Sequence, residues 1–162
     1  MGPDRCSELD SIPWASLPQP SWNGPTAVPD AIRRLAALKT GEDARRAYDD
    51  FLYAVGNNHA GTYFPVVLHT LPFLEEILRS PPGLAQQTTL DVLVDLLGSF
   101  APDPGHQVVG TSTGKSVALQ KLVREGVARF ADVIATLARS GSPEAPTRRL
   151  AEALLECLSE TP

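Results

Sequence analysis

The stretch GTSTGKS, residues 110–116, comes close to a phosphate-binding loop. Such a loop has the pattern G-x-x-x-x-G-K-[ST], because four intervening residues let successive backbone N–H groups turn around a phosphate while the lysine reaches across it. Here three residues separate Gly110 from Gly114, and Val109 stands where the longer spacing needs glycine. The spacing therefore favours a loop with an exposed Lys115, and nucleotide binding stays open as an alternative.

The surroundings of this stretch also differ from those of a phosphate-binding loop. Such a loop leaves a buried parallel strand and enters a helix, whereas only two valines precede Gly110. Residues 101–114 instead predict one long loop, of the kind that is often functional or mobile in a compact domain. A helix is expected to resume near Lys115, with Thr111 or Thr113 as its cap.

The histidines and cysteines give no catalytic or metal-binding pattern. His59, His69 and His106 have no nucleophile or carboxylate at a recognisable spacing. Cys6 and Cys157 lie near opposite ends of the chain and lack metal-ligand spacing, which indicates reduced cysteines. The sequence thus predicts a protein that is not an enzyme, with no cofactor and no metal site.

Composition predicts a cytoplasmic protein that does not enter a membrane. The longest uncharged apolar run, residues 63–74, is too short to span a bilayer and contains His69 and two prolines. The first ten residues lack the apolar region of a signal peptide. The net charge of −5 argues against a nucleic-acid ligand, because neutralising phosphates requires clustered Lys and Arg, but it leaves a basic protein partner open.

Acidic side chains are the best candidates for binding such a partner. Asp91 and Asp95 stand at i, i+4 on an otherwise apolar helix, where two carboxylates repel each other. Something basic should therefore face them. An internal side chain such as Arg45 or Lys121 is slightly favoured over a cation on a partner. The full set of candidate partner-binding residues is Asp49, Asp50, Glu75, Glu76, Asp91, Asp95 and His106.

The apolar pattern predicts one all-α domain, residues 1–162, with seven or eight helices. Leu and Ala supply 40 residues and Ile only four, which favours helix over strand. No segment alternates convincingly between apolar and polar residues with period two. The expected helical segments are 29–39, 41–55, 65–79, 84–100, 115–137 and 143–158.

Prolines, glycines and small polar residues mark the expected ends and breaks of these helices. Pro72 should kink its helix or split it in two, and Gly126 marks a possible break in the segment from 115. Thr40 is the expected cap of the helix from 41. The polar face of that helix offers Arg45–Asp49 and Arg46–Asp50 pairs at i, i+4, which are typical of a solvated surface.

The N-terminal segment, residues 1–28, is rich in proline and tryptophan. Residues 1–30 carry six of the fifteen prolines, so no regular helix is expected there. Trp14 and Trp22 carry large apolar side chains, which would be unfavourable in a segment that does not pack on the rest of the protein. We expect this segment to pack on the first helices.

Several motifs in the first two thirds of the chain resemble small bacterial HEAT-like repeat proteins. The matching positions are Trp22, Val28-Pro29, Asn58-His59, Thr62-Tyr63 and Pro72-Phe73-Leu74. The likeness covers roughly residues 14–100 and departs from the pattern at Ala60, where glutamine would follow the histidine. Segments from 40, 80 and 142 also resemble one another, and a spacing of about 40 residues is typical of helix-pair repeats.

This resemblance implies a short HEAT-like superhelix of stacked antiparallel helix pairs. Many such proteins are similar to predicted immunity proteins of bacterial toxin systems. The implied function is therefore to bind a cognate toxin and cover its active site, and an acidic surface would suit a basic nuclease toxin. A helical-repeat adaptor without a toxin needs the same kind of surface and stays open as the alternative.

Overall fold

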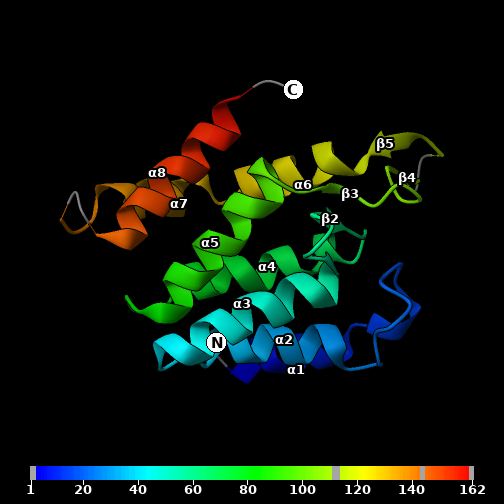
Figure 1. The fold of residues 1–162 in the computed structure, drawn as a ribbon, viewed down its shortest axis with the longest axis horizontal. Coiled ribbons are helices and arrows are strands. Elements are labelled where there is room, and N and C mark those ends of the chain that lie inside the picture. Colours follow the sequence, from blue (N-terminus) through cyan, green and yellow to red (C-terminus); the bar gives the residue numbers. More distant parts are fainter. Residues whose placement is uncertain (1–2, 111–113, 143–144, 161–162) are drawn as a thin grey trace.

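In a computed structural model the chain is mainly helical, and its helices follow one another from α1 at the bottom of Figure 1 to α8 near the top. The structure describes residues 3–110, 114–142 and 145–160. Within these ranges lie eight α-helices and one short 3₁₀ turn, so the expected number of helices is confirmed for this part of the chain. They are α1 (Pro3–Ser11), η1 (Trp14–Ser16), α2 (Ala27–Ala36), α3 (Gly41–Val55), α4 (Val67–Leu78), α5 (Leu84–Gly98), α6 (Leu119–Ala128), α7 (Ala131–Arg139) and α8 (Pro146–Ser159).

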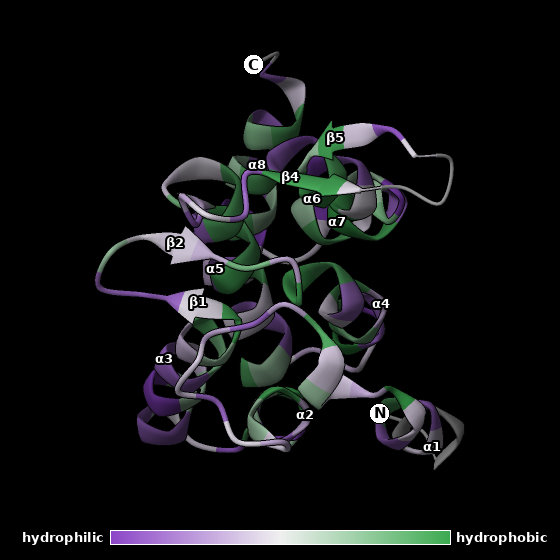
Figure 2. Cartoon of the chain, turned by 90° about the vertical axis from the view of Figure 1, so that its right-hand side faces the viewer, coloured by the Kyte–Doolittle hydropathy of each residue, from purple (hydrophilic) through white to green (hydrophobic). Residues whose placement is uncertain are grey.

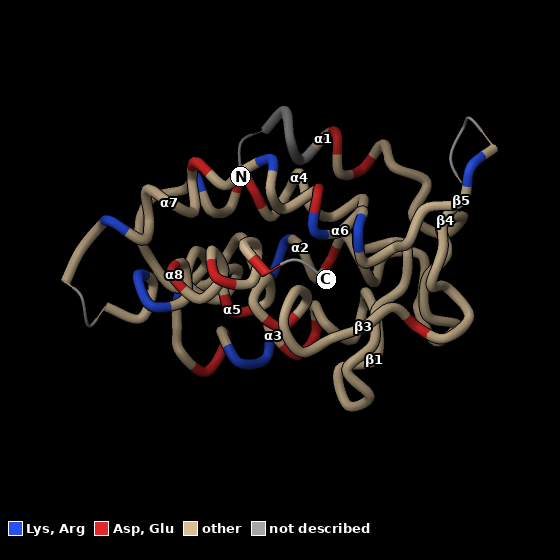
Figure 3. Tube along the Cα trace, turned by 90° about the horizontal axis from the view of Figure 1, so that it is seen from above, with Lys and Arg blue, Asp and Glu red and all other residues tan. Residues whose placement is uncertain are grey.

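From α2 to α6 the chain alternates between two layers of helices, and α7 follows α6 in the same layer. One layer holds α2, α4, α6 and α7, and the other holds α3, α5 and α8 (Figure 3). Consecutive helices pack together across the layers, α2 on α3, α4 on α5 and α7 on α8, while α5 packs on both α3 and α8 within its own layer. Short connections, residues 37–40 between α2 and α3 and residues 79–83 between α4 and α5, make each of these two pairs fold back on itself.

Five short strands among the described residues show that the all-α prediction was incomplete. β1 (Gly56–Asn57) pairs antiparallel with β2 (Thr62–Tyr63), which pairs in parallel with β3 (Ala101–Pro102). β4 (Val108–Gly110) and β5 (Ser116–Ala118) form an antiparallel hairpin. Strands of two or three residues are too short to display the period-two alternation by which a strand is recognised in a sequence.

The described residues at the two ends of the GTSTGKS stretch belong to or adjoin the paired strands β4 and β5. Gly110 closes β4, Gly114 has a φ of +75°, and Ser116 opens β5. Thr111 and Thr113, the expected caps, lie outside the described residues. The next helix, α6, begins at Leu119, later than expected, so a strand and not a helix follows the lysine. This context is not the strand-to-helix connection of a phosphate-binding loop.

Two helix breaks differ from the sequence-based expectation. Pro72 lies inside α4, which continues as one helix. The long helix from 115 breaks at Arg129 and Phe130, between α6 and α7, and not at Gly126. A Cβ atom on Gly126 would lie 2.4 Å from Cδ1 of the buried Leu71, so this glycine allows α6 to approach α4 closely.

The start of α3 is confirmed and that of α8 is corrected. Thr40 caps α3 as predicted, because its hydroxyl oxygen accepts the Asp43 N–H at 3.2 Å. α8 begins at Pro146, which takes the first turn, where a proline's missing N–H costs no hydrogen bond. The expected first-turn residue, Pro143, lies outside the described residues.

The N-terminal segment packs on the helices, as its tryptophans predict, but it also contains a helix, α1, which its proline content argued against. No other proline stands between Pro3 and Pro13, so α1 fits between them. Trp14 is buried, its ring lies 6.3 Å from that of Phe73, and its Nε1 donates to the Leu9 carbonyl oxygen at 2.8 Å. This contact anchors α1 and η1 to α4.

The hydrophobic core lies between the two layers. Figure 2 shows hydrophobic turns in α4 and α5, while α3 has a hydrophilic outer side. Tyr63 of β2 is fully buried, and its hydroxyl has no hydrogen-bond partner among the described residues. Burial raises the pKa of Tyr63 to about 12. Because the Tyr63 ring is buried in the core, it holds the sheet of β1, β2 and β3 against the helices.

Candidate functional site: an acidic groove between α3 and α5

Two adjoining clefts run between α3 and α5. One has a volume of about 660 Å³, and we call it the wider cleft; the other has a volume of about 440 Å³. Both are lined by Arg45, Tyr48 and Asp49. We call the two together the acidic groove. The aspartates that line it are Asp49, Asp50, Asp91 and Asp95, and among the described residues Arg45 is the only arginine or lysine that lines it.

Helical spacing on both walls sets the lining of the groove. Arg45, Tyr48 and Asp49 stand at i, i+3 and i+4 on α3, so they share one side of that helix. Asp91 and Asp95 stand at i, i+4 on α5. The packing of α3 on α5 brings the two rows together, and Figure 3 shows acidic positions on both neighbouring helices. The turn between β1 and β2 contributes to one end of the groove.

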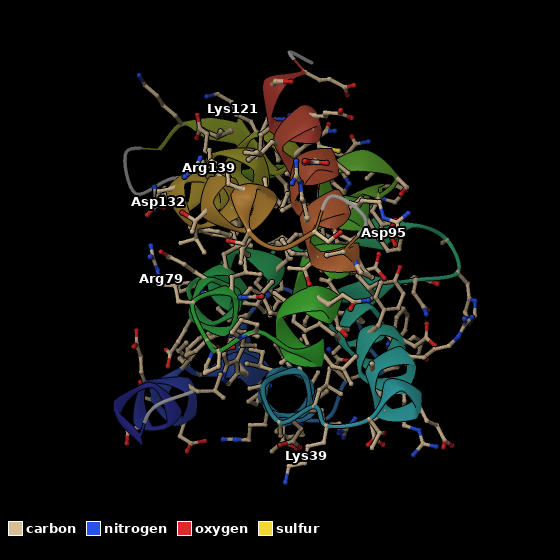
Figure 4. All side chains as sticks on the ribbon, turned by 90° about the vertical axis from the view of Figure 1, so that its left-hand side faces the viewer. Lys39, Arg79, Asp95, Lys121, Asp132 and Arg139 are labelled. Carbon is tan, nitrogen blue, oxygen red and sulfur yellow. The ribbon has the colours of Figure 1, made fainter. Side chains whose placement is uncertain are left out.

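Asp95 is held by hydrogen bonds from α3 and from the residue that follows α5. The Tyr48 hydroxyl of α3 donates to its Oδ2 atom, and Ser99 Oγ donates to its Oδ1 atom at 2.7 Å. Burial, the hydrogen bond to Asp95 and the neighbouring carboxylates raise the pKa of Tyr48, so the phenol remains a donor at neutral pH. A hydroxyl therefore takes the place of the internal cation that was expected, and Lys121 lies far away on α6 (Figure 4).

Asp49 and Asp91 carry the unpaired negative charge of the groove. Neither makes an ion pair or a hydrogen bond with another side chain in the part of the chain that the structure describes. Partial burial, and then the charge of Asp95, raise the pKa of the Asp91 carboxyl above its ordinary value. These two carboxylates are thus the ones that a cation from outside would stabilise most.

The two ion pairs expected along α3 do not form within the described residues. Arg45 lines the groove without an ion pair to Asp49. Asp50 lies at the edge of the groove, where its Oδ2 accepts from Arg34 Nη1 of α2 at 2.6 Å, and not from Arg46. Packing of α2 on α3 brings Arg34 closer to Asp50 than helical spacing brings Arg46.

The other candidate residues do not line the groove. Glu75 lies on α4 and accepts from Arg79 Nη2 at 2.8 Å, and that guanidinium also lies 3.5 Å from Asp132 of α7 (Figure 4). Glu76 is half-buried on α4. His106 lies between β3 and β4, 3.3 Å from Asp103. The structure therefore gathers the four aspartates and separates them from the other three candidates.

The aromatic residues of the groove were not among the sequence-based candidates. Tyr48 fixes Asp95, while Tyr53 and Phe100 line the wider cleft. Trp22 packs against α3, as expected, but its side chain stays 45% exposed and stacks on Tyr53. One sequence signal was available, since Tyr53 follows Asp49 at i+4 on the same side of the helix.

Other kinds of site find no support in the described residues. No three or more His, Cys, Asp or Glu side chains are grouped there so that they could hold a metal ion. No helix within the described ranges is both long and apolar enough to cross a bilayer. Comparisons of the chain with protein-family models, curated proteins and solved structures gave no match. Its function must therefore be inferred from the groove and the sequence motifs.

Replacing Asp91 by asparagine is expected to stabilise the protein slightly, by about 0.3 kcal/mol at neutral pH, because it removes the repulsion from Asp95. The pKa of Asp91 in the folded state lies above the ordinary value of 3.8, so the charged form costs stability and this cost disappears as pH falls through that pKa. The stability gained by Asp91→Asn should therefore become smaller at acidic pH. Urea unfolding at several pH values measures it.

The matched control is Asp95→Asn, which should have the opposite effect. Its side chain keeps one acceptor oxygen for the two donors, Tyr48 and Ser99, so a loss of about 1 kcal/mol is expected. Equal effects of the two substitutions would contradict the different roles that the structure gives Asp91 and Asp95.

Proposed function

We propose that this chain is a protein-binding module whose acidic groove binds a basic segment of a partner protein. The observation that carries the proposal is that Asp49 and Asp91, from two packed helices, line the same cleft and have no hydrogen-bond or ion-pair partner among the described side chains. Carboxylates that lose water on binding need a compensating cation, so lysine and arginine side chains are the matching ligands. The groove is large enough for several side chains.

The charge of the whole chain supports the same class of partner. A net charge of −5 attracts a basic protein over a distance of several ångströms and speeds its association. The effect is screened by salt, because the Debye length is about 8 Å at physiological ionic strength. A complex formed through the groove should therefore weaken as the salt concentration rises.

The more specific proposal is that the chain is an immunity protein that neutralises a basic bacterial toxin by covering its active site. Its motifs resemble those of HEAT-like proteins of this kind, and the alternation of helices between two layers is compatible with stacked helix pairs. The groove lies on the layer formed by the second helix of each pair. A helical adaptor that binds a basic protein without a toxin link is the alternative.

Co-expression of the tagged chain with the product of the neighbouring reading frame tests this proposal. We expect a stable complex that dissociates progressively with salt, and growth of cells that the neighbouring product alone would arrest. A complex without protection would favour the adaptor. The absence of a complex, with both proteins soluble, would refute the immunity proposal for that pair.

A further inference from the structure

Two exposed aromatic side chains form a continuous surface at the edge of the acidic groove. Trp22 and Tyr53 are 45% and 46% exposed, and their rings stack with centroids 5.2 Å apart and planes inclined by 27°. Among the described residues the other large exposed hydrophobic side chain is Val108, on the β4–β5 hairpin. Stacked aromatic rings left open to water are a surface suited to a ligand.

The N-terminal segment holds this aromatic pair in a fixed position. Trp22 Nε1 donates to the Tyr53 carbonyl oxygen at 3.3 Å, and Asn23 Nδ2 donates to the Ala54 carbonyl oxygen at 2.7 Å. Both carbonyls belong to the last turn of α3, where the helix itself supplies no donors. Asn23 Nδ2 also donates to Gln19 Oε1 at 2.9 Å. The indole therefore needs little ordering when a ligand binds.

The aromatic pair adjoins the negative charges of the groove. Tyr53 lines the wider cleft together with Asp49 and Asp50. These aspartates precede Tyr53 by four and three residues on α3, so all three side chains share one side of the helix. A ligand that lies on the aromatic faces thus reaches unpaired carboxylate oxygen at Asp49.

We infer that Trp22 and Tyr53 form a cation–π subsite that takes an arginine side chain of the basic partner. This inference rests on the proposed function and names the residue type that the groove recognises. A planar guanidinium can lie on an aromatic face while its edge donates to a carboxylate, which the compact lysine ammonium does less well. An apolar occupant would bury Asp49 without a compensating charge.

Titration with octa-arginine and octa-lysine peptides tests the subsite. Trp22→Leu should weaken octa-arginine binding about fivefold, because it keeps apolar bulk but removes the aromatic face. Trp22→Phe should restore most of the affinity, and octa-lysine should be less sensitive to both changes. Val108→Ala is the matched control, since it removes an exposed apolar side chain away from the groove, and it should leave both affinities unchanged. Circular dichroism checks that each variant is folded.

Tryptophan fluorescence gives a second readout. Trp14 is buried, so a change in emission on adding octa-arginine to the wild type should come from Trp22 and be absent in Trp22→Leu. Unchanged octa-arginine affinity in Trp22→Leu, with weaker binding in an Asp49→Asn, Asp91→Asn double variant, would overturn the subsite and leave the groove proposal standing. No binding of either peptide to the wild type would overturn the groove proposal itself.

Discussion

Replacing Gly56 by alanine is expected to destabilise the protein by about 3 kcal/mol or more. A Cβ atom at this position would lie 1.9 Å from the Thr62 carbonyl oxygen and 2.8 Å from Cα of Tyr63. Both atoms belong to the backbone of β2, the strand that pairs with β1, so no side-chain rotation can relieve the overlap. Thermal or urea unfolding followed by circular dichroism measures the loss.

Gly41→Ala is the matched control for this substitution. Gly41 is the first residue of α3, and no other heavy atom lies within 4 Å of a Cβ built there. Its replacement should change stability by no more than about 0.5 kcal/mol. If Gly56→Ala were as stable as Gly41→Ala, the close pairing of β1 with β2 would be wrong.

The same close contact bears on the acidic groove. The turn between β1 and β2 carries Asn58 and His59, which line one end of the wider cleft. β2 is also tied to the segment after α5, because the Asp103 N–H donates to the Tyr63 carbonyl oxygen at 2.8 Å. Separation of β1 from β2 would thus move one end of the groove as well as reduce stability.

Reversing two charges in the groove, Asp49→Lys with Asp91→Lys, is expected to weaken the complex with a basic partner by at least about 100-fold. Two unpaired carboxylates that attract the partner become two cations that repel it, and like charges brought together in an interface cost several kcal/mol. The remaining affinity should depend less on salt. Isothermal titration calorimetry of the purified partner at low and physiological salt measures both effects.

A double variant with the same change in net charge elsewhere separates a groove effect from a general one. Glu156→Lys with Glu160→Lys alters exposed residues at the C-terminal end of α8, which do not line the groove. It should slow association modestly, because long-range attraction is lost, without a large change in the dissociation rate. Equal losses of affinity in the two double variants would argue that the partner binds elsewhere.

Much of the helical architecture follows from local sequence pattern. Apolar residues at helical spacing predict α3 and α5 closely, and Thr40 marks the start of α3, because both signals act within a few residues. Composition likewise predicts a mainly helical chain. The same local signals fail for β1 to β5, since strands this short are stabilised by partners distant in sequence and not by their own residues.

The sequence predicted some of the residues of the groove but not their separate roles. Spacing alone pairs Asp91 with Asp95 on one side of a helix, and the sequence identified both as candidates. It did not separate their roles, because Tyr48 reaches Asp95 only through the packing of α3 on α5. Likewise, Arg34 forms its ion pair with Asp50 only through the packing of α2 on α3.

The sequence by itself determined the helices from α2 onward, their approximate ends and the excess of negative charge, all of which depend on residue type and on neighbours within a few turns. Tertiary structure alone decided which carboxylates lack an internal partner and which aromatic rings stay exposed. Trp22 and Tyr53 stand 31 residues apart and meet because the N-terminal segment supplies the donors that the last turn of α3 needs. Such a contact depends on how distant segments pack, which no local pattern records.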